Sequence, residues 1–319
     1  MQPLARLLAF LGIFLVAGVA SAQGYPSKPV RLLVPFPPGG STDMVARMIS
    51  PKLGELLGQQ IFVDYKGGAG GSIGAAQAAR AAPDGYTVLM VTDTHAMNHH
   101  VYRVPYDFFK SLDPISLLVQ APGILVAHPG FAPSTVKELI DYARANPEKV
   151  TYGSAGVGNA SHLSGFLFGH MTGVKMTHVP YKGGGPLITD LLGGHVNIAF
   201  GTLPLYAQLV KSGKLKLIAV LSKTRIPQFP DVPAATETVP GFEYKTWYGL
   251  LAPAGTPKEI VVRLNREVVR ALADVTLKGQ LVSRGFDITA SSPEAFAAFL
   301  RQESDVAGRL VRDLEIKPE

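Results

Sequence analysis

The side chains of this chain that are best suited to binding chemistry are hydroxyls that stand next to glycines in short loops. Residues 37–42, 67–72 and 92–98 each combine small and polar residues behind a run of aliphatic ones. Glycine lets the backbone come close to another molecule, and a helix that starts behind such a loop offers unpaired N–H groups to an anion. An ordinary strand-to-helix turn explains one such loop equally well. Because the chain repeats the arrangement, we expect an anion-binding site.

The hydroxyls come from both halves of the chain. Ser41, Thr42, Thr92, Thr94 and Ser154 can converge with backbone N–H groups on one anion. No Arg occurs in any of these loops, so a bidentate guanidinium clamp is not expected. The sequence therefore predicts that dipoles, rather than fixed cations, hold the ligand.

Several charged or titratable residues of these loops can be interpreted in two ways. Lys182 is the one lysine or arginine in them, and it either contacts the ligand or is a solvated loop residue. His162 either contacts the ligand or bonds locally at a helix start, whereas Asp190 is better suited to brace its own loop. A periplasmic hydrolase that uses Ser154, His162 and Asp190 is an alternative, because such triads are defined by geometry rather than by sequence order.

Other functions are excluded by the absence of their motifs. Gly68-x-Gly70 is followed by Ile73 where a dinucleotide fingerprint needs a third glycine, and no phosphate-binding G-x-x-x-x-G-K-[ST] stretch occurs. The G-x-S-x-G elbow and the H-E-x-x-H metal pair are also missing. The chain has no cysteine, which excludes disulfides, thiol catalysis and cysteine-ligated metals. We expect neither a metal nor a cofactor.

Charge and the first residues indicate where the protein works. The 319 residues carry a formal net charge of +6, and the basic residues are scattered, so we do not expect nucleic acid as a partner. Arg6 precedes an apolar run over residues 7–20, and Ala20-Ser-Ala22 has the form of a signal-peptidase site. We predict a cleaved signal peptide over residues 1–22, localisation in a bacterial periplasm, and a monomer.

The candidate loops lie between strands and helices that alternate along the chain. Strands expected at residues 30–34, 60–65 and 86–91 alternate with helices, which predicts an α/β fold with parallel pairing. Ligands bind beyond the carboxyl ends of such strands. Similar strands at residues 123–129 and 248–253 are expected to cross between two lobes. We predict lobe one over residues 23–122 and 250–319, lobe two over residues 123–249, and a ligand cleft between them.

Motifs spaced over the whole chain after residue 22 resemble one family. They read YPSKPVR (25–31), VPFPPGGSTD (34–43), GGAGGSIG (67–74), PDGY (83–86), YGSAGVGNASHL (152–163), VPYKG (179–183) and TDLLGG (189–194). This set is similar to the substrate-binding proteins of tripartite tricarboxylate transporters, also called Bug proteins. The resemblance implies a two-lobed periplasmic binding protein, of a type II-like fold, that captures a small organic carboxylate for a membrane permease. It implies no catalysis. A ligand sensor for a membrane kinase is an alternative function.

The loops and the resemblance together define the candidate site. The expected ligand-binding residues are Phe36, Gly40, Ser41, Thr42, Asp43, Gly70, Thr92, Asp93, Thr94, Asn98, Ser154, Gly156, Gly158, Asn159, His162, Lys182, Gly183 and Thr202. Asp93 stands where the family has a small or hydroxyl residue, so its carboxylate either points into the cleft or turns back onto its own loop. Leu187 and Ile188 replace smaller residues, which is expected to narrow the site, and Gly185 replaces an alanine.

Overall fold

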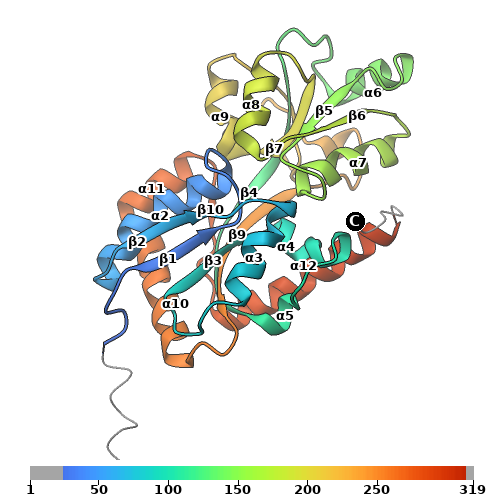
Figure 1. Cartoon of the computed structure of the whole chain (residues 1–319). Helices are drawn as coiled ribbons and strands as arrows, with labels where there is room; N and C mark the ends of the chain where they lie inside the picture. The colour runs from blue at the N-terminus through green and yellow to red at the C-terminus, as the bar shows by residue number, and fades with distance from the viewer. Residues whose placement is uncertain (1–23, 314–319) are drawn as a thin grey trace, which may run out of the picture.

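The computed structural model of the protein describes residues 24–313, and the predicted signal peptide lies outside these residues. The described chain forms an α/β structure of two lobes, and one long strand runs through both of them (Figure 1). None of the helices between residues 24 and 313 is long and apolar enough to cross a membrane.

The described residues form strands and helices in the alternating order that the sequence predicts. The strands are β1 (Val30–Val34), β2 (Ile61–Tyr65), β3 (Thr87–Thr92), β4 (Leu112–Ala127), β5 (Thr151–Ser154), β6 (Thr177–Pro180), β7 (Ile198–Thr202), β8 (Lys216–Val220), β9 (Lys245–Pro253) and β10 (Asp287–Ile288). The helices are α2 (Ser41–Leu57), α3 (Ser72–Ala79), α4 (Asp93–Val101), α5 (Phe108–Ser111), α6 (Val136–Ala145), α7 (Ala160–Thr172), α8 (Gly184–Leu192), α9 (Leu203–Lys211), α10 (Lys258–Ala273), α11 (Val275–Ser283) and α12 (Pro293–Asp313).

One strand belongs to the sheets of both lobes. The strands follow the order β2-β1-β3-β9-β4-β7-β5-β6, with β10 and β8 also paired to β4. The first part of β4 pairs with β9, and its last part pairs with β7 and β8. The parallel pairing of β1 with β2 and β3 confirms the expectation for the first third of the chain.

The second crossing lies just before β9. Its residues 245–253 pair with residues 112–122 of β4, and residues 248–251 also pair with β3. All of β9 therefore lies beside strands of lobe one. This pairing favours a return of the chain to lobe one near residue 245, a few residues before the predicted position at 250.

Each lobe buries apolar side chains on both faces of its sheet. In lobe one, successive strand residues enter opposite cores because side chains alternate along a strand: Leu32 packs beneath α2 and α10, whereas Leu33 packs on the side of α3 and α12. Lobe two repeats this layering, with Leu125 and Ile124 of β4 on opposite faces. The loops at the strand ends are left to face the other lobe.

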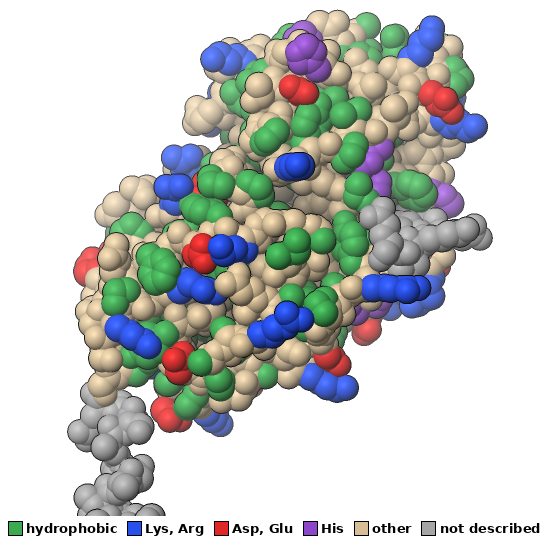
Figure 2. All heavy atoms as spheres, viewed as in Figure 1, with side chains coloured by type: hydrophobic (Ala, Val, Ile, Leu, Met, Phe, Trp, Pro, Cys, Tyr) green, Lys and Arg blue, Asp and Glu red, His purple; other side chains and the backbone are tan. Residues whose placement is uncertain are grey.

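Helix α2 contains a proline in its interior. Such a proline usually kinks or splits a helix, but α2 runs without interruption from Ser41 to Leu57. Pro51 is exposed, so water can take the carbonyl that the missing proline N–H leaves unpaired. Basic side chains are scattered over the face of both lobes shown in Figure 2.

Candidate functional site

A cavity of about 80 Å³ lies between the two lobes. Its lining is drawn from loops of lobe one, loops of lobe two and strand β9. The lining residues are Phe36, Pro37, Gly40, Ser41, Thr42, Thr92, Asp93, Thr94, Ala155, Asn159, Ala160, Ser161, Gly183, Gly184, Leu187, Phe200, Gly201, Thr202, Leu205, Tyr206, Tyr244, Thr246 and Tyr248. A water needs about 10–15 Å³ of such space, so the cavity has room for several waters or a small organic molecule.

Five helices begin at this cavity. The N-terminal residues of α2 and α4 line it from lobe one, and those of α7, α8 and α9 line it from lobe two. The first N–H groups of a helix have no partner within the helix, and the helix dipole places partial positive charge at that end. Five such ends around one small cavity make it a site for an anion.

Fixed charge in the lining is limited to one acid. None of the described lining residues is Lys, Arg or His, and Asp93 is their one carboxylate. The carboxylate of Asp93 accepts hydrogen bonds from the hydroxyls of Tyr244 and Thr246, each at 2.9 Å. Burial raises the pKa of Asp93 to about 6, because the neutral donors around it only partly replace the lost water.

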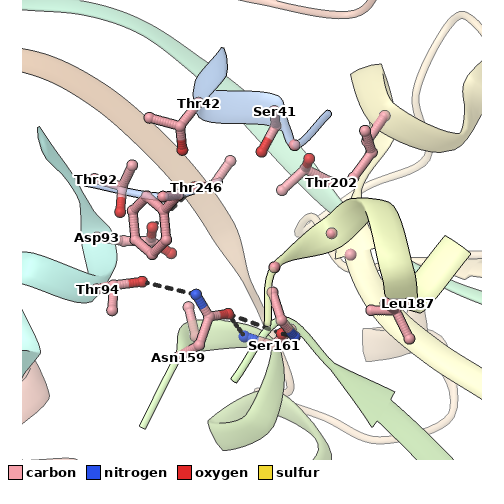
Figure 3. A pocket seen from close by; sticks show the side chains of 18 of the residues that line it. Ser41, Thr42, Thr92, Asp93, Thr94, Asn159, Ser161, Leu187, Thr202 and Thr246 are labelled. Atoms are coloured by element: carbon pink, nitrogen blue, oxygen red, sulfur yellow. Dashed lines mark hydrogen bonds between the residues drawn. The ribbon is translucent and has the colours of Figure 1, made fainter. Parts of the chain in front are cut away.

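The two lobes meet at both rims of the cavity. At one rim a Cβ atom placed on Gly184 would lie 3.6 Å from the Cα atom of Gly40 in the other lobe. At the other rim the amide nitrogen of Asn159 donates to the hydroxyl of Thr94 at 3.3 Å (Figure 3). The Tyr102 hydroxyl also donates to the carbonyl of Val157. The structure is therefore closed around the cavity.

Two hydroxyls of the lining are buried without a hydrogen-bond partner among the described residues. They are Oγ1 of Thr202 and the phenolic oxygen of Tyr248, whose residue is 1% exposed. The hydroxyls of Ser41, Thr202 and Thr246 lie near the Tyr248 oxygen, but none of them makes a hydrogen bond of normal geometry with it. A buried polar group that lacks a partner is unfavourable by about 1–3 kcal/mol. Both groups are available to a bound ligand, which would remove this unfavourable term.

Ten of the eighteen predicted site residues line the cavity. They are Phe36, Gly40, Ser41, Thr42, Thr92, Asp93, Thr94, Asn159, Gly183 and Thr202. Leu187, which was expected to narrow the site, also belongs to the lining. Asp93 accepts its side-chain hydrogen bonds from Tyr244 and Thr246, which lie about 150 residues further along the chain. These two bonds are therefore not made within its own loop.

Three predicted residues of lobe one lie outside this lining. The carboxylate of Asp43 accepts from the backbone N–H of Gly39 at 2.9 Å and from Nε of Arg47 at 2.7 Å. It therefore fixes the loop before α2 rather than pointing into the cavity. Asn98 donates to the carbonyl of Gly70 at 3.0 Å, which ties α4 to the glycine-rich loop.

The remaining predicted residues of lobe two lie behind the lining. Oγ of Ser154 lies 2.6 Å from Nε2 of His178, and the ring of His162 stacks on His178 with centroids 4.0 Å apart. Gly158 donates its N–H to Nδ1 of His162, and Ser154 bonds both backbone groups of Gly156. These contacts stiffen the loop that carries Asn159.

The hydrolase triad is not assembled. Ser154 is fully buried and pairs with His178 rather than with His162. The carboxylate of Asp190 accepts from the hydroxyl of Tyr181 at 2.8 Å, so it braces its own loop as the sequence suggested. Lys182 is exposed and does not line the cavity.

The sequence did not point to the contribution of β9. Thr246 and Tyr248 of β9 line the cavity together with Tyr244, which directly precedes the strand, since every second residue of extended chain points to the same side. This alternation of hydroxyl-bearing residues was the available signal. It was missed because the strand was expected to begin at residue 248.

Comparison with known proteins decides the family. Residues 45–316 match the family described as "Tripartite tricarboxylate transporter family receptor". The chain belongs to this family. Protein BugT of Bordetella pertussis is 35% identical over 320 residues, covering 98% of both chains. The resemblance found in the sequence motifs is thus confirmed.

Solved structures of family members share the fold. The periplasmic binding protein BugD is 36% identical with a TM-score of 0.89, over 92% of this chain and 100% of its own. Rpa4515 of R. palustris, solved with adipate, is 35% identical with a TM-score of 0.89 and the same coverage. MatC of Rhodopseudomonas palustris, with bound malate, is 32% identical with a TM-score of 0.86, over 90% of this chain and 100% of its own. The predicted two-lobed fold is confirmed.

Proposed function

We propose that this family member is a periplasmic receptor that captures a small organic carboxylate between its lobes for a tripartite tricarboxylate-type permease. The convergence of five helix N-termini on a closed cavity carries this proposal. Backbone N–H groups and hydroxyls are the natural partners of a carboxylate where no arginine or lysine is present.

The relatives support the chemical class of the ligand. Rpa4515 was solved with adipate and MatC with malate, and both ligands are carboxylates. The two proteins cover 92% and 90% of this chain, so the resemblance includes both lobes and the cleft. A carboxylate ligand for this chain follows from the shared fold together with the cavity described above.

The location and the mode of delivery belong to the same proposal. BugD is a periplasmic binding protein, and a signal peptide over residues 1–22 would send this chain to the same compartment. Closure of lobe one, residues 24–122 and 245–313, on lobe two, residues 123–244, would let a permease distinguish the loaded receptor from the empty one.

A thermal-shift screen tests ligand binding. The mature protein would be heated with mono-, di- and tricarboxylates, and with sugars and nucleotides for comparison. An acid at about 100 times its dissociation constant should stabilise the fold by about 2.7 kcal/mol. Stabilisation by sugars or nucleotides together with no response to any acid would overturn the proposal.

The transport role needs a second measurement. Uptake of the identified acid by the source bacterium should fall when the gene for this protein is deleted. Unchanged uptake would contradict the permease partner and would favour a sensor that reports the bound acid to a membrane kinase.

A further inference from the structure

Asp93 has an unusual position for the receptor of an anion. It is the first residue of α4 and lines a cavity that five helix N-termini make attractive to negative charge. No lysine, arginine or histidine shares the described lining, so the cavity contains one negative charge and no countercharge. A ligand that carries only carboxylates cannot supply one.

The surroundings of Asp93 leave its carboxylate partly unsatisfied. Tyr244 donates to Oδ2 and Thr246 donates to Oδ1, and the backbone N–H of Thr94 also stabilises the ionised carboxylate. An ionised carboxylate offers about four acceptor sites, so further donors can be accommodated. Burial also raises the pKa of Asp93, because the neutral donors around the carboxylate compensate only part of the cost of removing it from water.

The cavity has two chemically different sides. Asp93 lies beside Thr92, Thr94 and Thr246, while Ser41 and Thr202 lie across the pocket (Figure 3). The N-termini of α2 and α9 carry Ser41 and Thr202, and Oγ1 of Thr202 has no partner among the described residues. A carboxylate held by this second side would direct the rest of its molecule toward Asp93.

We infer that Asp93 makes this receptor selective for acids that carry a hydrogen-bond donor, an ammonium or a hydroxyl group, a few atoms from the bound carboxylate. This inference rests on the proposed function and narrows its ligand class. A second ionised carboxylate near Asp93 would be repelled, because two like charges about 4 Å apart at an effective dielectric of about 20 lower the affinity by several hundredfold. An ammonium group would instead supply the missing countercharge.

Calorimetry with matched ligand pairs tests the inference. Each pair has the same carbon chain and differs at one end: adipate against ε-aminocaproate, and succinate against γ-aminobutyrate. The wild-type protein should bind the amino acid of at least one pair about tenfold or more tightly than its dicarboxylate, as expected for a hydrogen bond to a charged group. Tighter binding of both dicarboxylates by the wild type would overturn the inference.

Variants identify the residue responsible. Asp93→Asn and Asp93→Ser should weaken binding of the amino acid and strengthen binding of the dicarboxylate, so that their ratio shifts by about tenfold or more. Asp305→Asn removes an equal charge from an exposed site on α12 and should leave the ratio unchanged. An unchanged ratio in a folded Asp93 variant would exclude Asp93 from selectivity. If no acid bound the wild type, the proposed function itself would fail instead.

Discussion

Asn159, the N-cap residue of α7 in lobe two, donates a hydrogen bond from its side-chain amide to the hydroxyl of Thr94 in lobe one. The carbonyl oxygen of the same side chain accepts from the N–H and the hydroxyl of Ser161, at 2.9 and 2.8 Å. One residue thus caps a helix that faces the ligand and links the two lobes. The link exists only when the lobes are closed.

Asn159→Ser should separate these two roles. Serine caps helices about as well as asparagine, but its shorter side chain cannot reach Thr94. We expect little change in the stability of the unliganded protein and an affinity about fivefold lower, which corresponds to one net hydrogen bond. Calorimetry and thermal melting measure both. Thr135→Ser at the exposed N-cap of α6 is the control, and an equal loss of affinity there would contradict the role of the link.

Tyr248→Phe should weaken ligand binding without weakening the fold. The Tyr248 hydroxyl is buried and makes no hydrogen bond of normal geometry among the described residues, although the hydroxyls of Ser41, Thr202 and Thr246 lie near it. Removing it should therefore change the stability of the unliganded protein by less than about 1 kcal/mol. The affinity for the ligand should fall about fivefold or more, because the ligand loses a donor.

Tyr25→Phe is the matched control for Tyr248→Phe. The Tyr25 hydroxyl donates to the carbonyl of Gly85 at 2.7 Å and lies outside the cavity. This change should cost about 1 kcal/mol of stability and leave the affinity unchanged. Urea unfolding and calorimetry on both variants give the comparison, and a loss of stability without loss of affinity in Tyr248→Phe would show that its hydroxyl is structural.

Gly184→Val should hold the lobes apart. A Cβ atom added at Gly184 would lie 3.2 Å from a methyl group of Leu205 and 3.6 Å from the backbone of Gly40, so a branched side chain would fill the rim where the lobes meet. Small-angle scattering of the wild type should show a smaller radius of gyration when a confirmed ligand is added. The variant should show no such decrease.

Gly279→Val provides the reference for this experiment. A Cβ atom at Gly279 meets no atom within 4 Å, and the residue lies in α11, away from the cleft. This variant should contract on binding as the wild type does. An unchanged radius in the liganded wild type would argue for a rigid receptor and against closure.

The stability of the protein should fall as the pH decreases from 6.5 to 4.5. Burial lowers the pKa values of His95, His99 and His178 to about 4, whereas an unfolded histidine has a pKa of about 6.5. The unfolded chain therefore binds more protons in this range, and stability is lost as the pH falls. The raised pKa of Asp93 acts in the opposite direction, since its folded carboxyl protonates first.

The pKa values of His100 and His162 are lowered as well, mainly by burial. The histidines therefore outweigh the one acid, with a net loss on the order of 5 kcal/mol over this interval. Urea unfolding at several pH values measures it. His178→Gln should flatten the dependence by up to one proton, about 1.4 kcal/mol per pH unit, whereas His195→Gln at an exposed position should not. A stability that is constant between pH 6.5 and 4.5 would contradict this balance.

The sequence by itself determined the local units of this protein and its family. The aliphatic strands, the glycine loops and the helix that starts at Ser41 follow from the chain's own torsional preferences and from the pattern of apolar residues. The helix starts at Asp93 and Ala160 are seen only in the structure. Because every parallel strand presents its carboxyl end at the same edge, these loops could be assigned to one cleft before their positions were known. Family membership followed from motifs that keep this order.

The tertiary structure decided which side chains face the cavity. Ser154 and Asp43 have residue types suited to binding, yet His178 and Gly39 engage them outside the cavity lining. Asp93 is held by Tyr244 and Thr246, partners about 150 residues away in the chain. A short side chain takes whichever partner the folded chain places within about 3 Å. For Ser154 and Asp93 those partners lie on other elements of the fold, at distances that local sequence does not determine.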